Sequence, residues 1–302
     1  MRNLTQPSRE LAREQLIVAL EVQETNGISS GYAASEAEID KVIALYDSYD
    51  ATSGVPSLLL EGQDLQAALR NAIQTGYELT QRGRRLSAIR SAVMQGIELC
   101  PVCGISPPRT LDHHLPKSIY HPLAIYIRNL VPLCADCNQS KSGAASTTAT
   151  EQFIHPYFDK LPDSRFLRAI VSIQNGGLIV DFDIDPETNL PDLLRARLNY
   201  QIRRLHLNRR YAQEINIHLA SHTTALHMCA DSLATAGVRR YLHAQAKVEF
   251  QQFHRNHWRP VLLSALGNHD DFCAGGFRDL LPLIADQIPT LITPAGAATA
   301  AE

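Results

Sequence analysis

The sequence predicts a mainly helical α+β protein in which one short cysteine-rich segment interrupts the helices. Residues 1–96, and the chain from Leu190 onward, place apolar residues at helical spacing. Residues 98–145 differ, with short apolar runs, proline-rich loops and clustered Cys, His and Asn. We therefore expect a helical N-terminal region (1–96), a small module (97–145), a β-hairpin followed by helices (146–292), and a disordered tail (293–302).

Start and stop signals place the elements of the N-terminal region. Helices are expected over residues 8–24, 35–49, 63–81 and 84–95. Gly27 is the expected stop of the first helix. Ser35 followed by Glu38 forms a capping-box signature that opens the second.

A β-hairpin is expected after the module. Residues 166–173 and 178–184 flank Asn175-Gly176, a turn pair that favours a two-residue hairpin loop. From Leu190 to Asp286 the pattern predicts three or four helical segments. The tail from Thr293 holds small residues with nothing to bury.

The net charge of −3 hides a strong asymmetry along the chain. Residues 1–80 carry 5 Lys/Arg against 12 Asp/Glu, a balance of −7. Residues 81–145 carry 8 against 3, or +5, and residues 195–260 carry 11 against 3, or +8. Local positive charge is what a nucleic-acid partner requires, although solvated basic helices have the same composition.

No apolar run reaches the roughly 20 residues needed to span a bilayer, and the first residues lack a secretory signal pattern. We therefore expect a cytoplasmic protein without a membrane partner. In such a chain, paired Cys-x2-Cys units predict metal ligands before disulfides. Two units are present, Cys100-Pro-Val-Cys103 and Cys134-Ala-Asp-Cys137. Four thiolates predict a closed tetrahedral zinc site that holds the fold and does no chemistry.

The residues between and after these cysteines carry a longer pattern. The chain reads Leu111-Asp112-His113-His114-Leu115-Pro116-Lys117, then Asn129-Leu130-Val131-Pro132-Leu133, then Cys137-Asn138-Gln139-Ser140-Lys141. This concatenation resembles the HNH endonuclease family, the ββα-metal group, over about 45 of the 302 residues. The resemblance implies two short strands and a helix, pinned by zinc, around a second metal ion.

The resemblance also implies residue roles. Asp112 and Asn138 match the family's ligands for a catalytic Mg²⁺ or Mn²⁺, and His113 matches the general base. Asn129 completes the catalytic set by holding the intervening loop through backbone hydrogen bonds. Lys141 is a candidate phosphate contact, with a solvated helix lysine as the alternative.

His114 departs from the family pattern, which places an apolar or aromatic residue there. A shifted register would put His113 on the metal and make His114 the base. We prefer the first register, because Asp112 and Pro116 then both match, and we interpret His114 as a packed histidine. The later run from His155 to Asp159 resembles a bacterial subset of the family with helical flanks.

Basic side chains outside the pattern supply candidate nucleic-acid contacts. Arg82, Arg84, Arg85 and Lys117 lie close to the module in sequence. A second basic set, Arg203, Arg204, Arg209 and Arg210, fits either a phosphate grip or a solvated helix face. Glu214, His218 and His222 recur every four residues, and we interpret them as structural, since no His-Glu-x-x-His arrangement is present.

These observations predict a metal-dependent endonuclease that hydrolyses phosphodiester bonds, of DNA rather than RNA. Its cofactors would be a structural Zn and a catalytic Mg or Mn. One alternative is a non-catalytic zinc-ribbon protein that binds nucleic acid. Another is a nuclease that is active only with a protein partner, such as an ATPase in a phage-defence or toxin system.

Overall fold

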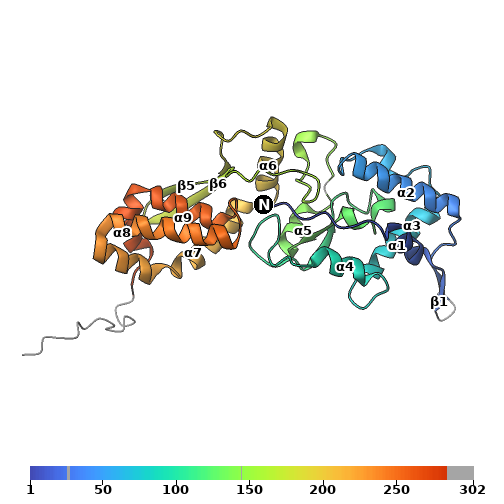
Figure 1. Ribbon diagram of the computed structural model, residues 1–302, viewed down its shortest axis with the longest axis horizontal. Coiled ribbons are helices and arrows are strands. Elements are labelled where there is room, and N and C mark those ends of the chain that lie inside the picture. The colour runs from blue at the N-terminus through green and yellow to red at the C-terminus, as the bar shows by residue number, and fades with distance from the viewer. Residues whose placement is uncertain (26–27, 144, 284–302) are drawn as a thin grey trace, which may run out of the picture.

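The computed structural model describes residues 1–25, 28–143 and 145–283. These residues are mainly helical, with three two-stranded antiparallel sheets in the described part of the chain. Helices α1–α3 lie at one end of an elongated molecule, α7–α9 lie at the other, and α5 lies between them (Figure 1). The predicted mainly helical α+β fold is confirmed.

The N-terminal region holds four α-helices, α1 (Ala12–Leu20), α2 (Glu36–Ala51), α3 (Ala67–Gly76) and α4 (Ser87–Met94). Ser35 and Glu38 form the predicted capping box, each accepting a hydrogen bond from the other's backbone N–H.

Two expectations for this region are wrong in detail. The first helix ends at Leu20, and the chain turns into strand β1 (Gln23–Thr25), which pairs with β2 (Ile28–Ser30). Backbone pairing between the two strands replaces the last helical turn. The expected stop, Gly27, lies outside the described residues. Within residues 63–81, α3 is followed by a 3₁₀-helix, η2 (Tyr77–Thr80).

The cysteine-rich module folds as a strand, a long loop, a strand and a helix. Strand β3 (Thr110–His113) pairs antiparallel with β4 (Leu130–Leu133), so that His113 lies opposite Leu130. Helix α5 (Ala135–Lys141) follows directly and packs on β3. Each Cys-x2-Cys unit is here called a knuckle. The fold therefore brings strand β3, which follows the first knuckle, next to helix α5, which starts at the second knuckle.

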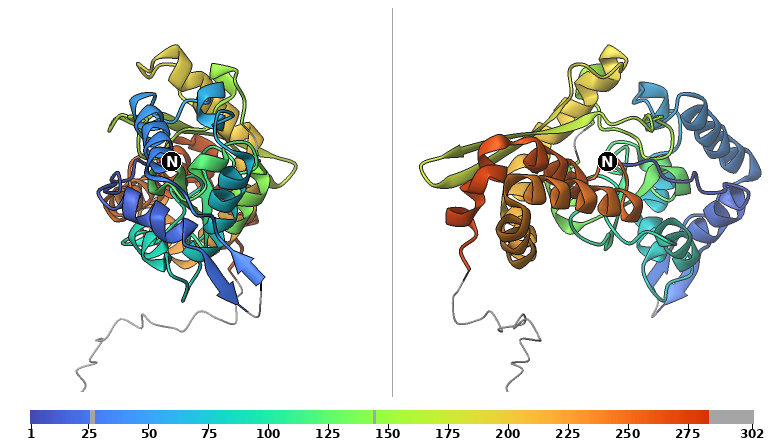
Figure 2. Two further views of the ribbon diagram at one scale, coloured as in Figure 1. Left: turned by 90° about the vertical axis from the view of Figure 1, so that its right-hand side faces the viewer. Right: turned by 60° about the vertical axis from the view of Figure 1, so that its left-hand side comes forward.

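The C-terminal region begins with the predicted hairpin, β5 (Leu167–Gln174) and β6 (Gly177–Ile184). Asn175 and Gly176 both have positive φ, 52° and 73°, as a two-residue hairpin turn of this type requires. The hairpin lies along the C-terminal helices (Figure 2). These helices are α6 (Asp192–Arg204), α7 (Leu207–Ala220), α8 (Thr223–Gln252), α9 (Trp258–Asn268) and α10 (Phe277–Leu280).

Helix α8 is two helices joined by a reversal. Ala234 has φ 50° and ψ −144°, which no helix accommodates. In a straight helix, His222 and Tyr241 would lie about 28 Å apart at 1.5 Å per residue. Instead the Tyr241 hydroxyl lies 2.6 Å from Nδ1 of His222, so the second half of α8 folds back along the first.

Two hydrophobic cores meet at the module. Leu111, Leu115 and Leu130 belong to the core built by the N-terminal helices. Val131 and Leu133, with the four module cysteines, belong to the core built by the hairpin and the C-terminal helices. The short β3–β4 sheet thus joins the two halves of the molecule. Among the described helices, none has the length and apolar character needed to cross a membrane. Asp286 and the expected tail lie outside the described residues.

Candidate metal centre and active site

Cys100, Cys103, Cys134 and Cys137 form one buried cluster, here called the four-cysteine cluster, whose sulfurs all lie within 4.8 Å of one another. Two of them, the sulfurs of Cys103 and Cys134, are 3.7 Å apart. Zinc–sulfur bonds of roughly 2.3 Å give a tetrahedron with edges of about 3.8 Å. The cluster therefore fits a zinc ion.

Arg210 of α7 donates hydrogen bonds to the cluster. Its Nη1 lies 3.2 Å from the sulfur of Cys137, and its Nη2 lies 3.5 Å from that of Cys103 and 3.6 Å from that of Cys134. A zinc ion with four thiolates carries a net charge of −2, and a guanidinium beside it offsets part of that charge. Neither sequence interpretation of Arg210, a phosphate grip or a solvated face, describes this position. No sequence signal sets Arg210 apart from Arg209.

We expect Arg210→Ala to weaken zinc binding by about 10- to 100-fold, because the thiolates lose their charged hydrogen-bond donor. Competition with a chromophoric chelator measures this change. Arg209→Ala is the matched control, since Arg209 is the exposed neighbour on the same helix. Equal zinc affinity in the two variants would remove Arg210 from the metal centre.

Side chains of the C-terminal region also bind the backbone at the first knuckle. The Tyr211 hydroxyl donates to the Cys103 carbonyl at 3.0 Å, and Nε2 of His257 donates to the Gly104 carbonyl at 2.9 Å. Gly104 has φ 67°, and a Cβ there would lie 2.7 Å from the His257 ring, so only glycine fits. The knuckle is therefore held by residues more than 100 positions away in the chain.

Asp112 and Lys141 form a buried ion pair inside the module. The Lys141 Nζ lies 2.8 Å from Oδ2 of Asp112, with side chains 6% and 15% exposed. The same ammonium donates to the backbone carbonyl of His113. Lys141 is thus buried, and it is not the solvated helix lysine that the sequence allowed as an alternative. In this structure the ammonium is bound to Asp112 and to the backbone, and the phosphate contact stays a prediction.

Asn138 lies three residues before Lys141 in α5, so the two residues share one face of the helix, one turn apart. Lys141 contacts Asp112, and this face is therefore the one that meets β3. A carboxylate and an amide oxygen are hard donors of the kind Mg²⁺ and Mn²⁺ take. Oδ2 of Asp112 is buried and lies 2.8 Å from the Lys141 ammonium, so a positive charge already sits beside this carboxylate. The residues present therefore fit a divalent cation.

His113 ends strand β3 and lies on the opposite side of the strand from Asp112. Its ring packs against Tyr77 at 4.5 Å between centroids, and its Nε2 donates to the Ala124 carbonyl at 2.9 Å. That bond places the proton on Nε2 and leaves Nδ1 as the basic nitrogen. Burial lowers the pKa of His113 to about 4, so the imidazole is neutral at pH 7.

Asn129 is fully buried and fastens the loop between β3 and β4. Its Oδ1 accepts from the Leu115 backbone N–H at 2.8 Å, and its Nδ2 donates to the carbonyls of Leu115 and Leu123 at 3.0 and 3.1 Å. The Tyr49 hydroxyl, from α2, donates to the same Oδ1 at 3.1 Å. Asn129 thus fixes the chain that follows His113.

His114 packs against His155, with 4.1 Å between ring centroids. The Tyr49 hydroxyl lies 2.9 Å from Nε2 of His155, and the two histidines are 9% and 1% exposed. Asp159 accepts from the His155 backbone N–H and pairs with Arg197 through both carboxylate oxygens. The His155–Asp159 run therefore belongs to the wall behind His114, on the Asp112 side of β3.

Lys117, another candidate nucleic-acid contact, shares the neighbour Tyr77 with His113. Its Nζ stands 4.4 Å above the ring of Tyr77, the residue that packs on His113, and 3.7 Å from a Glu78 carboxylate oxygen. Arg85 pairs with Glu21. Arg82 and Arg84 are exposed and make no ion pair with the described residues. Arg82 and Arg84 are thus available to an anion, whereas Lys117 already faces the Glu78 carboxylate.

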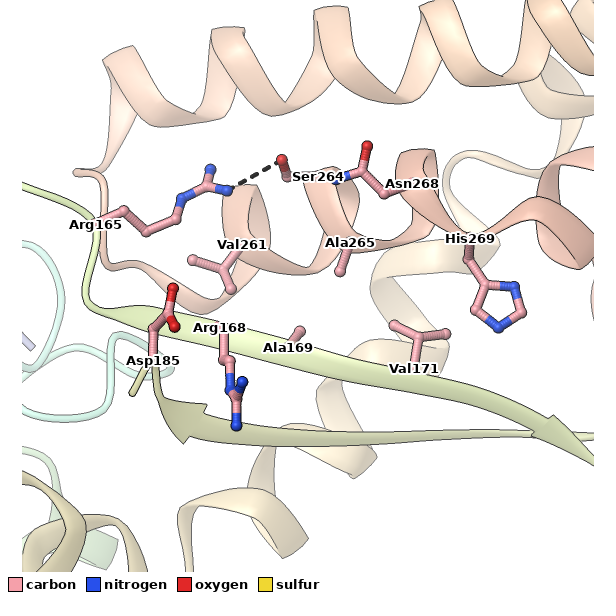
Figure 3. Close-up of a pocket in the computed structure, with 10 residues that line it drawn as sticks. All are labelled: Arg165, Arg168, Ala169, Val171, Asp185, Val261, Ser264, Ala265, Asn268 and His269. Atoms are coloured by element: carbon pink, nitrogen blue, oxygen red, sulfur yellow. Dashed lines mark hydrogen bonds between the residues drawn. The ribbon is translucent and has the colours of Figure 1, made fainter. Parts of the chain in front are cut away.

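A separate groove lies between strand β5 and helix α9 (Figure 3). Arg165 and Arg168 line it, and Arg165 donates to the Ser264 hydroxyl at 3.1 Å. No residue of the cysteine-rich module lines this groove. We assign no part of the chemistry to it.

Comparisons with known proteins agree with this geometry. Residues 100–143 match the family described as HNH endonuclease. Over 244 residues the chain is 26% identical to Protein ea31 of Escherichia phage lambda, a match that covers 76% of this chain and 81% of that protein. No solved structure matches. The family match spans the four cysteines, β3, β4 and α5, and the predicted resemblance is confirmed. Residues 100–143 thus form an HNH domain.

Proposed function

We propose that this protein is a divalent-metal-dependent endonuclease that hydrolyses phosphodiester bonds, with DNA as its substrate. One observation carries the proposal. A buried carboxylate that already holds a cation, Asp112, is joined through the backbone to a neutral imidazole of fixed tautomer, His113. A binding module would need neither group. The alternative, a zinc ribbon that only binds nucleic acid, does not explain them.

Asp112 and Asn138 would hold the Mg²⁺ or Mn²⁺ ion, which when bound stabilises negative charge on the scissile phosphate and on the departing oxygen. Nδ1 of His113 would take a proton from the attacking water. The Ala124 carbonyl would hold the other ring nitrogen, which steadies the ring during that transfer. Asn129 would keep the loop after His113 in place, and Lys117 would contact a phosphate.

The two side chains lie on opposite faces of β3, and β3 ends at His113. A phosphate bound on the Asp112 side would therefore meet the imidazole past the end of the strand. Lys141 would release Asp112 as the divalent ion binds, because both cations use the same carboxylate.

Purified protein incubated with supercoiled plasmid tests the proposal. We expect cleavage with Mg²⁺ or Mn²⁺ and none without a divalent ion. Asp112→Asn should be inactive while it keeps its zinc, which separates loss of the catalytic ion from loss of the fold. Plasmid binding without cleavage would favour the zinc-ribbon alternative. If the zinc-loaded protein does not cleave the plasmid alone but cleaves it when cell extract is added, the partner-dependent nuclease is favoured.

A further inference from the structure

A second group of metal-ligating side chains lies in the C-terminal helices, away from the HNH domain. His218 near the end of α7, His222 between α7 and α8, and Glu249 near the end of α8 are 8%, 6% and 5% exposed. One ligand atom from each residue lies within 4.8 Å of the others. We call these three residues the His–His–Glu cluster.

The reversal within α8 assembles this cluster. His218 and His222 are one turn apart in sequence, whereas Glu249 is 27 residues beyond His222. The break at Ala234 lets the second half of α8 return, so that Glu249 arrives beside the two histidines. Glu214, the residue that the sequence pattern placed with them, is not a member.

The cluster leaves buried polar atoms without partners. Nε2 of His218 and Oε2 of Glu249 are buried and make no hydrogen bond with the described residues. Nε2 of His218 and Oε1 of Glu249 are 3.5 Å apart, at the outer limit of hydrogen-bond distance. Unpartnered buried atoms cost free energy unless something else binds them.

His222 is already oriented in the way that metal-binding histidines are. Its Nδ1 lies 2.6 Å from the Tyr241 hydroxyl, and its Nε2 makes no hydrogen bond with the described residues. A partner on one ring nitrogen fixes the ring and leaves the other nitrogen for a metal.

We propose that His218, His222 and Glu249 form a second metal site, which takes a borderline divalent ion such as Zn²⁺. Two imidazole nitrogens and one carboxylate oxygen are a common three-residue ligand set for zinc, and these donors also suit Co²⁺. The site differs from the four-cysteine cluster in having no sulfur ligand. It also leaves room for a fourth ligand, which the closed thiolate site does not.

Arg259 limits how tightly this site binds. Its guanidinium lies 5.3 Å from the ring of Trp258, which itself packs 5.5 Å from His218. A nearby positive charge opposes a cation, so Zn²⁺ binds here more weakly than at the four cysteines, and mild chelation removes it first.

The second ion would fasten the α7–α8 corner to the end of α8, behind the zinc knuckle. Trp258 stacks on Tyr211 at 5.8 Å, and Tyr211 donates its hydroxyl to the Cys103 carbonyl. The two metal sites are thus joined by one column of packed rings. This role is structural support of the HNH domain from its C-terminal side.

The only tryptophan of the chain, Trp258, reports directly on this site. Co²⁺ is added to the full-length protein with zinc already in its four cysteines, and the fluorescence of Trp258 is followed. We expect one further metal equivalent to bind, with strong quenching, and without the thiolate-to-cobalt absorption that exchange at the cysteines would give. Total metal analysis after Zn²⁺ loading should find two equivalents per chain.

Glu249→Gln should abolish the quenching and the second equivalent, and Glu214→Gln, the matched control on α7, should leave both unchanged. His222→Asn gives the same readout should Glu249→Gln fail to fold. A wild-type chain that binds zinc at the cysteines alone overturns the proposal. So does quenching that survives in both ligand variants.

Discussion

Removing the zinc from the four-cysteine cluster is expected to unfold the HNH domain. Structural zinc sites supply on the order of 10 kcal/mol of apparent binding free energy, which exceeds or equals the whole stability of many domains. Two cores meet at this module, and the cysteines belong to one of them. Loss of the ion would remove the link between the two Cys-x2-Cys units and would release α5 from β3.

Circular dichroism during a thermal scan measures this effect, with and without a strong chelator. We expect the melting temperature to fall steeply on chelation and to return when Zn²⁺ is added back. Glu249→Gln serves as the control, because it keeps all four cysteines and lacks the proposed second site. An unchanged melting temperature in protein shown to be free of metal would contradict the structural role of the cluster.

His113→Ala is expected to lower the rate of phosphodiester cleavage by about 10²- to 10⁴-fold, the usual contribution of a general base. The neutral ring, its fixed tautomer and its place at the end of β3 all point to proton transfer. Removing the side chain leaves the carboxylate of Asp112 and the zinc centre in place. Substrate binding should therefore change little.

His114→Ala is the matched comparison, since it removes the neighbouring imidazole from the other face of the same strand. His114 is packed against His155, so we expect a loss of stability with cleavage retained at the permissive temperature. The opposite result, an active His113→Ala protein and an inactive His114→Ala protein, would establish the shifted register. Initial rates on a labelled duplex, with binding measured separately, distinguish the two.

Local signals in the sequence predicted much of the fold. The Cys-x2-Cys pairs and the Asp-His, Asn and Asn positions between and beside them are short motifs whose spacing specifies one module. The Ser35 cap and the Asn175-Gly176 turn act within a few residues, and both were confirmed. In each case the residues that determine the structure lie next to one another in the chain.

The features that the sequence did not predict depend on contacts between distant residues. Arg210 contacts Cys137, which is 73 positions away in the chain. No residue near Arg210 in the sequence indicates that it lies beside a sulfur cluster. Glu249 joins His218 only because α8 reverses at Ala234, a break with no proline or glycine at that position. Prediction of the Asp112–Lys141 ion pair would have required knowledge of how closely α5 packs on β3, because helical spacing alone is equally compatible with an exposed lysine.

The proposed role of Asp112 has a consequence for Lys141. Burying an ion pair is costly unless the geometry is good, and breaking one leaves an uncompensated charge. A divalent ion at Asp112 would replace the ammonium and satisfy the same carboxylate. The pair can therefore serve as the metal-free state of the site, with the lysine holding Asp112 in position.

The most direct test is a crystal of this protein soaked in Mn²⁺ and measured for anomalous scattering. We predict a peak between the carboxylate of Asp112 and the amide oxygen of Asn138, distinct from the zinc in the four cysteines, with the Lys141 ammonium moved away from Asp112. A map with zinc at the cysteines, no manganese near Asp112 and the Lys141 contact intact would contradict it.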